Sequence, residues 1–442
     1  RLSPSDAPHD DEQEHRAKHG RPPDLVRFGR ILRVRRALVS SFALLLLPGC
    51  SALLEADFFD GHLRVDASGG DAVDAAATDA GDTAKPESER ITIAAGGGST
   101  CAISSAGGVK CWGDNTDGQL GVGATGLGSR VPVDVIGIDA QVRSLSVGNS
   151  HACAVTVGGA ARCWGSNRHG ELGDGTNDPS TVAKRVVGLT AGVASVMAAM
   201  EFTCALMTSG EVKCWGLNAE GQLGDGDNTD SNVPVDVQAI STATAVVGGG
   251  SHACAKKSSG EVVCWGDGNQ NQLGTYRSSS NVPIRVAKLD SIVTSLAAGW
   301  AHTCALSGRG VECWGANQYG QLGGGAASAN EEYVVVGAFA GAVAVGAGAE
   351  HSCVLTDAGA KCWGNGENGR LGNDSNLLSR DPVAVAGLPA SLRAITSSAT
   401  AAHTCVRRVD DGIMCWGMNR VGRLGDDTLV DAWTPVAVVG FP

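Results

Sequence analysis

The chain is short of aromatic residues, of basic residues and of long apolar runs. It has 9 Trp, 7 Phe and 3 Tyr among 442 residues, against 63 Gly. A core that is poor in rings and rich in small residues favours closely packed strands over helical bundles. The formal net charge of −12 argues against nucleic acid as the main partner, because phosphate binding needs a basic face.

Phosphate-cradling motifs of the Walker or Rossmann type are missing from any strand–helix context, so we expect no cofactor. The apolar run at 37–47 is shorter than the roughly 20 residues with which a helix crosses a bilayer. It fits the apolar part of a secretory signal, which spans about 7–15 residues behind a positive segment. Five Arg stand between positions 27 and 36, so the pattern predicts export.

The end of this run resembles the lipobox of bacterial lipoproteins. It reads Leu47-Pro48-Gly49-Cys50, in which Pro48 departs from the small or β-branched residue usual at its place. The resemblance implies lipidation of Cys50, a membrane anchor there and, because Ser51 follows, an outer-membrane lipoprotein with a periplasmic or surface-facing head. Plain secretion, with Cys50 merely nearby, is the alternative.

Two other segments precede the repetitive part of the chain. Residues 1–25 are polar and no Met occurs before Met197, so we expect translation to begin near Leu25 or Val26. Residues 51–90 hold ten acids and three bases among many Ala and Gly, which predicts a disordered linker. We therefore expect an extension with a signal at 1–50, a linker at 51–90 and a repetitive domain at 91–442.

Cysteine positions reveal a period near 50 residues in that domain. Fourteen of the 15 Cys form seven pairs whose members lie nine or ten residues apart, and Cys50 is the fifteenth. Each pair encloses a Gly-containing turn, which predicts a β-hairpin with the two Cys facing each other at disulfide distance. The predicted bridges are Cys101–Cys111, Cys153–Cys163, Cys204–Cys214, Cys254–Cys264, Cys304–Cys313, Cys353–Cys362 and Cys405–Cys415.

Two further strands flank each hairpin. A strand of small residues such as Ile93–Gly96 precedes it, and such residues belong where strands crowd near an axis. An outer strand such as Val131–Val135 follows, where Pro removes no ladder bond. Seven units of four strands predict an all-β, seven-bladed β-propeller with one disulfide in each blade. Whether the last outer strand, Pro435–Val438, joins blade seven or blade one stays open.

The loop after each Cys-Trp-Gly is more specific. The first reads Trp112-Gly-Asp-Asn-Thr-Asp-Gly-Gln-Leu-Gly121, and the third and fifth repeat its Asn and its Gly-Gln-Leu-Gly. The pattern resembles the repeat of the regulator of chromosome condensation family, a seven-bladed β-propeller, in all seven units. Units four and six depart at Gly268, Asn271 and Gly366, which we interpret as compatible turn variants.

The resemblance implies guanine-nucleotide exchange on a nuclear GTPase coupled to chromatin. Export, paired Cys and the 40 acids against 25 bases from Ser51 onward argue against that activity here. Exported bacterial members of the fold instead imply binding through loops on one propeller face. We expect a monomeric head that binds a macromolecule, protein first and glycan second. A nucleotide-exchange activity, a propeller enzyme (hydrolase or lyase) and a purely structural envelope component are the alternatives.

Two recurring residue types invite a functional interpretation. Trp follows Cys on one strand, so its side chain points to the opposite sheet face and packs against the neighbouring blade, with carbohydrate stacking as the alternative. A His-x-Cys pattern suggests zinc, but Cys with disulfide partners cannot supply thiolates, so we expect a hydrogen-bonding His and no metal. Ser99 and Phe202 take the His place in units one and three. The other five units have His151, His252, His302, His351 and His403.

His169 is the one propeller His outside that position, and no nucleophile stands near it in the sequence, so we expect no catalytic residue. Residues that vary between repeats are free to contact a ligand. In the loops before the His position these are Asn149, Met200, Glu201, Trp300 and Glu350. Trp300 is the strongest anchor candidate, because exposed aromatics dominate binding surfaces. A second predicted binding set comprises Tyr276, Arg277, Tyr319, Tyr333 and Trp433.

Overall fold

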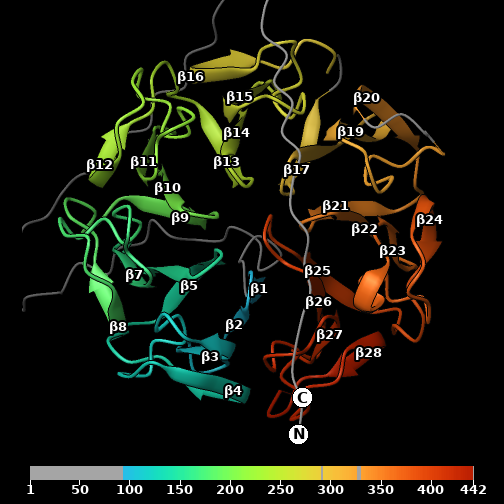
Figure 1. Ribbon diagram of the computed structural model, residues 1–442, viewed down its shortest axis with the longest axis horizontal. Helices are drawn as coiled ribbons and strands as arrows, with labels where there is room; N and C mark the ends of the chain where they lie inside the picture. The colour runs from blue at the N-terminus through green and yellow to red at the C-terminus, as the bar shows by residue number, and fades with distance from the viewer. Residues whose placement is uncertain (1–92, 290–291, 326–329, 442) are drawn as a thin grey trace, which may run out of the picture. The chain divides into compact units, whose positions relative to one another are not determined.

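The computed structural model describes residues 93–289, 292–325 and 330–441, which form seven four-stranded antiparallel sheets arranged as the blades of a propeller (Figure 1). The signal segment, Cys50 and the linker at 51–90 lie outside the described residues. Within the described ranges, no helix has the length and apolar character needed to cross a membrane.

Four strand positions recur in each blade, from the centre to the rim. The innermost strands are β1 (Ile93–Ala95), β5 (Val142–Val147), β9 (Val193–Ala198), β13 (Ala243–Gly248), β17 (Val293–Ala298), β21 (Ala342–Ala347) and β25 (Leu392–Thr396). The second strands are β2 (Ser99–Ile103), β6 (His151–Thr156), β10 (Phe202–Met207), β14 (His252–Lys257), β18 (His302–Ser307), β22 (His351–Thr356) and β26 (His403–Arg408).

The remaining two positions complete each sheet. The third strands are β3 (Val109–Asn115), β7 (Ala161–Gly165), β11 (Val212–Gly216), β15 (Val262–Asp267), β19 (Gly310–Ala316), β23 (Gly359–Gly364) and β27 (Ile413–Gly417). The outer strands are β4 (Gly126–Asp134), β8 (Ser180–Arg185), β12 (Ser231–Asp236), β16 (Ser279–Arg285), β20 (Asn330–Gly337), β24 (Ser379–Ala384) and β28 (Ala432–Ala437). One short 3₁₀ helix, η2 (Glu367–Gly369), lies in blade six.

The ring closes without exchange of strands. β28 pairs with β27, so the last outer strand belongs to blade seven, and blade one consists of β1 to β4. Side chains join the two blades instead. The indole Nε1 of Trp112 and the hydroxyl of Thr100 both donate to the backbone oxygen of Arg423, at 2.9 and 2.8 Å.

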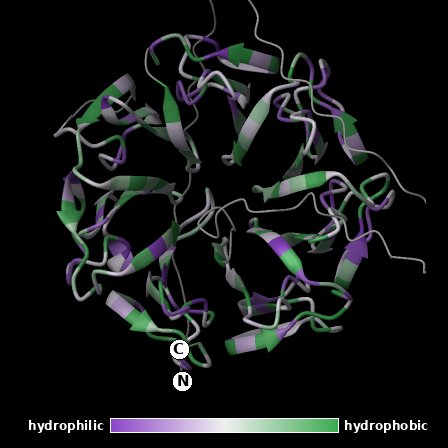
Figure 2. Ribbon diagram, turned by 180° about the vertical axis from the view of Figure 1, so that it is seen from behind, coloured by the Kyte–Doolittle hydropathy of each residue, from purple (hydrophilic) through white to green (hydrophobic). Residues whose placement is uncertain are grey.

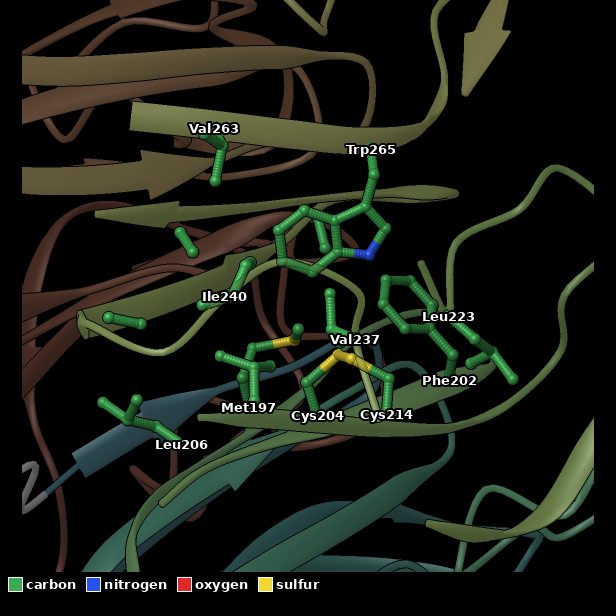
Figure 3. Packing of buried hydrophobic residues seen from close by; sticks show 14 of the residues in the cluster. Met197, Phe202, Cys204, Leu206, Cys214, Leu223, Val237, Ile240, Val263 and Trp265 are labelled. Atoms are coloured by element: carbon green, nitrogen blue, oxygen red, sulfur yellow. A yellow bond between two sulfur atoms is a disulfide. The ribbon is translucent and has the colours of Figure 1, made fainter. Parts of the chain in front are cut away.

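The second and third strands of each blade form the predicted disulfide hairpin. Cys204 lies directly opposite Cys214, with the two Cα atoms 4.0 Å apart, and the other six predicted pairs are also bonded. The adjacent Trp points the other way and packs against the preceding blade. Trp265 of blade four covers the Cys204–Cys214 bridge of blade three, together with Met197 and Val237 (Figure 3).

All seven repeated Trp side chains are fully buried. Because the indole N–H would otherwise be an unsatisfied donor, each ring needs an acceptor at the blade interface. In every blade this acceptor is the backbone oxygen of the residue before Leu in the preceding blade's Gly-x-Leu-Gly loop, whose first Gly is Asn271 in blade four, at 2.7–3.0 Å. Viewed from behind, apolar stretches lie along strands throughout the ring (Figure 2). The predicted structural role of the Trp is confirmed.

The departures in units four and six have a local cause. Asn271 adopts a φ of 63°, the left-handed conformation that Gly takes in the other loops and that Asn tolerates. At Gly268 and Gly366 the loop folds back so closely that a Cβ would stand 2.2 Å from Arg277 O and 1.9 Å from Leu377 O. Both loops therefore require Gly where the other units have Asn.

Removal of one bridge tests the contribution of the disulfides. We expect Cys204→Ala combined with Cys214→Ala to lower the free energy of unfolding by about 2–3 kcal/mol, because the unfolded chain loses a ten-residue closed loop. Urea unfolding followed by circular dichroism measures the change. Ser209→Ala, in the exposed turn of the same hairpin, is the control and should leave stability within about 0.5 kcal/mol. Equal stability of the double variant and the parent would contradict the prediction.

Candidate functional site

The two ends of the propeller carry different kinds of connection. Because each sheet is a meander, the loops from first to second strand and from third to fourth strand share one face, which we call the loop face. The hairpin turns lie on the other face. The innermost strands surround a central cavity of about 190 Å³ that is lined mostly by Ala, Val and Leu. Small residues thus occur where the strands converge, as the sequence predicts.

The loops around the channel mouth are linked by backbone hydrogen bonds from blade to blade. Asn149 N donates to Ala199 O at 3.1 Å, and Trp300 N donates to Ala349 O at 3.3 Å. Gly250 N donates to Trp300 O at 2.9 Å. These bonds hold the variable side chains of the loops on a firm backbone, which favours preorganised binding.

Three of the predicted binding residues share one pocket. Asn149, Met200 and Glu201 line a cavity of about 80 Å³ on the loop face, between blades one, two and three. We call it the acidic pocket. Its complete lining is Asp117, Asn149, Ser150, Ser166, Arg168, Glu171, Met200 and Glu201. The other five, Asp117, Ser150, Ser166, Arg168 and Glu171, are not among the residues predicted from the sequence.

Trp300 and Glu350 lie elsewhere on the loop face, in blades five and six. Trp300 is 44% exposed, and its ring rests beside Gly250, where a Cβ would stand 3.3 Å from Cδ2. Glu350 is held by its own blade, since its Oε2 accepts hydrogen bonds from Arg370 at 2.8 Å and from Asn365 at 2.9 Å. Trp300 therefore presents an aromatic surface, whereas the carboxylate of Glu350 orders the loop beneath it.

The second predicted set does not form one cluster. Tyr276 is 83% exposed beside the exposed Arg277, and Trp433 is 43% exposed at the start of an outer strand. Tyr319 is half-buried in a loop of blade five. Tyr333 instead stacks on Trp314, with ring centroids 6.5 Å apart, and its hydroxyl is buried. The Tyr333 side chain therefore contributes to the core.

Glu171 breaks the repeat in a way that the sequence displays. The residue before Leu in the Gly-x-Leu-Gly loop is Gln in four units and Arg in two, and unit two alone has Glu. The corresponding residues are Gln119, Glu171, Gln222, Gln272, Gln321, Arg370 and Arg423. All seven are buried, so a change of charge at this position alters the interior of one blade rather than its surface.

The five repeated His side chains bridge neighbouring blades. Each Nε2 lies 2.6–2.9 Å from a Thr or Ser hydroxyl of the next blade. In four of the five interfaces that hydroxyl donates its proton to the backbone oxygen that also accepts the Trp N–H. The hydroxyl must then accept from the His, which assigns the Nε2–H tautomer. The hydrogen-bonding role predicted for these His is confirmed.

The two blades without this His also differ at the partner position. Ser99 takes the His position in blade one, and the facing position in blade two is Ala152. Phe202 takes the His position in blade three, and the facing position in blade four is Ala253. The other blades have Thr or Ser at this facing position. His and hydroxyl thus occur together or not at all across the seven interfaces. This pairing is visible in the sequence, but it gains meaning only once the blades are known to be neighbours.

Burial holds these His in the neutral form. It lowers the pKa of His151 and His302 to about 4 and of His252 and His351 to about 3, and that of His403 falls well below its ordinary value. Within the described part of the chain, Nδ1 of four of them is buried without a hydrogen-bond partner. A proton added there would create an unpaired buried charge, which is strongly unfavourable.

His169 has a different environment on the loop face. Its Nδ1 lies 2.9 Å from Asp230 Oδ2. Partial burial opposes its protonation, but the hydrogen bond to Asp230 and the charges of Glu171 and Glu201 outweigh burial and raise its pKa. Among the described residues, no group of three or more His, Cys, Asp or Glu side chains is arranged to hold a metal ion.

Comparison with known sequences follows the same repeat. Residues 138–441 match the RCC1-like domain, and residues 91–119 and 106–155 match the regulator of chromosome condensation (RCC1) repeat. The chain belongs to the RCC1-like domain family. The seven blades, the Trp–carbonyl bonds and the Gly-x-Leu-Gly loops described above are thus the architecture of an RCC1-like domain.

Relatives of this RCC1-like domain are similar over only part of their length. The ultraviolet-B receptor UVR8 of Arabidopsis thaliana is 33% identical over 148 residues, which make up 33% of this chain and 33% of UVR8. The human E3 ubiquitin-protein ligase HERC2 is 30% identical over 154 residues, 34% of this chain and 3% of HERC2. The chain therefore spans a third or less of these curated relatives.

Solved structures share the fold more completely. Human WBSCR16 superposes with a TM-score of 0.67 at 20% identity, covering 74% of this chain and 92% of that protein. Prp20p from Saccharomyces cerevisiae gives 0.65 at 22% identity, covering 75% and 85%. At identities this low the superpositions show a common propeller fold and say nothing of a common ligand.

The buried His predict acid sensitivity of this RCC1-like domain. Each has an ordinary pKa of 6.5 when unfolded and a lowered one when folded, so between pH 6.5 and about 4 the unfolded chain binds more protons. Stability should fall as pH drops through this window, by up to about 1.4 kcal/mol per pH unit for each His. Urea unfolding at intervals from pH 7 to 5 measures this slope.

A paired substitution isolates one His. His302→Phe with Ser352→Ala copies the natural Phe202 and Ala253 arrangement at a different interface. We expect the pH slope of stability below pH 6 to decrease by about one proton, or about 1.4 kcal/mol per unit. An unchanged slope in this variant would show that His302 does not contribute to acid sensitivity.

Proposed function

We propose that this RCC1-like domain is a non-enzymatic recognition protein that binds a macromolecule, protein first and glycan second, through its loop face. The observation that carries the proposal is that repeated and variable residues have different roles. The repeated Cys, Trp and His form disulfides and hydrogen bonds between blades. The variable residues at the channel mouth include an exposed Trp300 and a charged pocket.

The surface around Trp300 suits a protein ligand. A Trp that is 44% exposed supplies a large apolar contact area at little entropic cost, and its loop is fixed on both sides by backbone bonds. A propeller of related fold, Prp20p, is described by its binding properties to Gsp1p and histones. This similarity supports macromolecular recognition as one use of the scaffold.

Seven disulfides favour an oxidising compartment. Together with the signal-like segment and the lipobox-like Cys50, they support a bacterial envelope lipoprotein whose head extends on the 51–90 linker. In that setting the partner is another envelope or extracellular molecule. A nucleotide-exchange activity would need a GTPase in the same compartment, and stimulated GDP release from a bacterial GTPase would establish it.

A catalytic function is the second candidate, because His169 has a carboxylate partner in Asp230. A His oriented by an acid is one element of hydrolytic sites. In the part of the chain that the structure describes, no Ser, Thr or Cys side chain is hydrogen-bonded to the other nitrogen of His169. Loss of a hydrolytic or lyase activity in His169→Ala, with binding retained, would favour this candidate.

Affinity capture tests the proposed function. The full oxidised chain is incubated with envelope and secreted fractions of the source organism, beside a Trp300→Ala variant. We expect a stoichiometric partner that is reduced at least about tenfold by the substitution, because loss of a central aromatic anchor costs about 2 kcal/mol or more.

Val157→Ala is the matched control, since Val157 is 46% exposed in a hairpin turn on the opposite face. If Trp300→Ala retained the partner and Val157→Ala lost it, recognition would lie on the face of the hairpin turns and the proposed use of the loop face would be wrong. An empty capture, combined with no glycan retained on an array, would favour a structural envelope component.

A further inference from the structure

The acidic pocket contains a buried carboxylate that the fold itself does not need. In the Gln blades, the side-chain oxygen accepts the backbone N–H two residues earlier, as Gln222 Oε1 does from Glu220 at 2.8 Å. Glu171 makes the same bond, since its Oε2 accepts from His169 N at 2.9 Å. Glutamine would therefore satisfy the loop equally well, and the carboxylate adds only its charge and a second acceptor oxygen.

The second oxygen of Glu171 has no such partner. Glu171 is 2% exposed and lines the cavity, and among the described residues no side chain or backbone donor is shown hydrogen-bonded to its Oε1. Burial, to which the nearby Glu201 adds, raises the pKa of Glu171. A buried carboxylate with a free acceptor is unfavourable unless a cation or donor reaches it. The unpaired oxygen is therefore available to a donor that enters the pocket.

The other charges around the pocket leave it negative. Arg168 lies 3.7 Å from Asp117, so these two largely neutralise each other at the rim. His169 is paired with Asp230 outside the lining. Glu171 and Glu201 remain as two carboxylates that make no ion pair among the described residues, and the imidazole of His169 interacts with both only through its charge. An incoming cation is therefore attracted to the inner end of the pocket.

The size and walls of the pocket restrict the cation. A volume of about 80 Å³ holds two or three water-sized groups, at roughly 30 Å³ each. Met200 provides an apolar side chain in the lining, and the small polar residues Ser150 and Ser166 also belong to it. An ammonium on a slender methylene stem fits this combination of acceptors and apolar wall. A metal ion fits less well, because the described acids and His form no group of three ligands.

We propose that the acidic pocket binds the primary ammonium group of a lysine side chain presented by a protein partner. The proposal rests on the proposed recognition function and names the chemistry of one contact within it. The ammonium donates to Glu171 Oε1 and to the Glu201 carboxylate, and its methylene stem lies against Met200. The lysine ammonium is a compact charge on a flexible stem, so it suits this small pocket better than the planar guanidinium of arginine.

Methionine methyl signals provide a direct readout. The chain has 5 Met, and the Met200 methyl, assigned with Met200→Leu, lies in the pocket. The full oxidised protein, labelled at the Met methyls, is titrated with Nα-acetyl-lysine amide, whose only charge is the side-chain ammonium. We expect a saturable shift of the Met200 signal that Nε-acetylation of the probe abolishes and that Nα-acetyl-arginine amide produces more weakly.

Glu171→Gln is the decisive variant, because it restores the residue that four other blades carry. Its fold is checked by unchanged Met197 and Met207 signals. We expect the probe's affinity to fall about tenfold or more, since a charge-assisted bond becomes unavailable. Glu211→Gln, an exposed residue in a hairpin turn on the opposite face, should leave affinity unchanged.

Three results would overturn the inference: no saturable shift, equal binding by Glu171→Gln, or equal binding of the Nε-acetylated probe. Its failure is separable from failure of the proposed function. A partner captured equally by the parent and by Glu171→Gln, but lost in Trp300→Ala, would leave the loop face as a recognition surface and remove lysine from this pocket.

Discussion

The propeller depends on one repeated interaction, the hydrogen bond from a buried Trp indole to the backbone oxygen of the Gly-x-Leu-Gly loop in the preceding blade. It occurs at all seven interfaces, including the one between Trp112 and Arg423 that closes the ring. The bond ties a strand of one blade to a loop of its neighbour. Because no strand is exchanged between blades, these contacts and the apolar packing around them hold the ring together.

The same loop oxygen explains why polar residues recur in the interior. At four interfaces a Thr or Ser hydroxyl also donates to this oxygen, and a neutral His donates to the hydroxyl. The oxygen therefore accepts from the Trp and from the hydroxyl, and the His is linked to it through the hydroxyl. Glycine is required beside the imidazole of these His residues. At Gly249 and Gly299 a Cβ would stand 2.1 and 2.0 Å from Cε1 of His252 and His302. Where Phe202 replaces His, the interface has Ala253, and apolar packing takes the place of the His–hydroxyl bond beside the remaining bond from Trp265 to Gln222 O.

Repetition and function are therefore separated in space. The repeated residues are buried in the packing within and between blades. The side chains that a ligand can reach stand at positions that differ from repeat to repeat. The seven buried positions before Leu show this directly, since they carry Glu in blade two, Arg in blades six and seven, and Gln elsewhere. Arg370 is neutralised by Glu350 within its blade, whereas Glu171 faces a pocket. One scaffold position thus serves a structural purpose in one blade and offers a binding group in another.

The sequence by itself determined the blades. Cys spacing, Gly turns and the invariant Trp act over about ten residues, so local pattern sufficed to predict seven hairpins, their disulfides and the direction of each Trp. It also placed Asn149, Met200 and Glu201 on a common face. Only the tertiary structure decided that these three share a pocket with Glu171, that Glu350 is held by Arg370, and that Tyr333 lies on Trp314. Those contacts join residues of different loops or blades, and their distances depend on the closure of the ring, which no local pattern encodes.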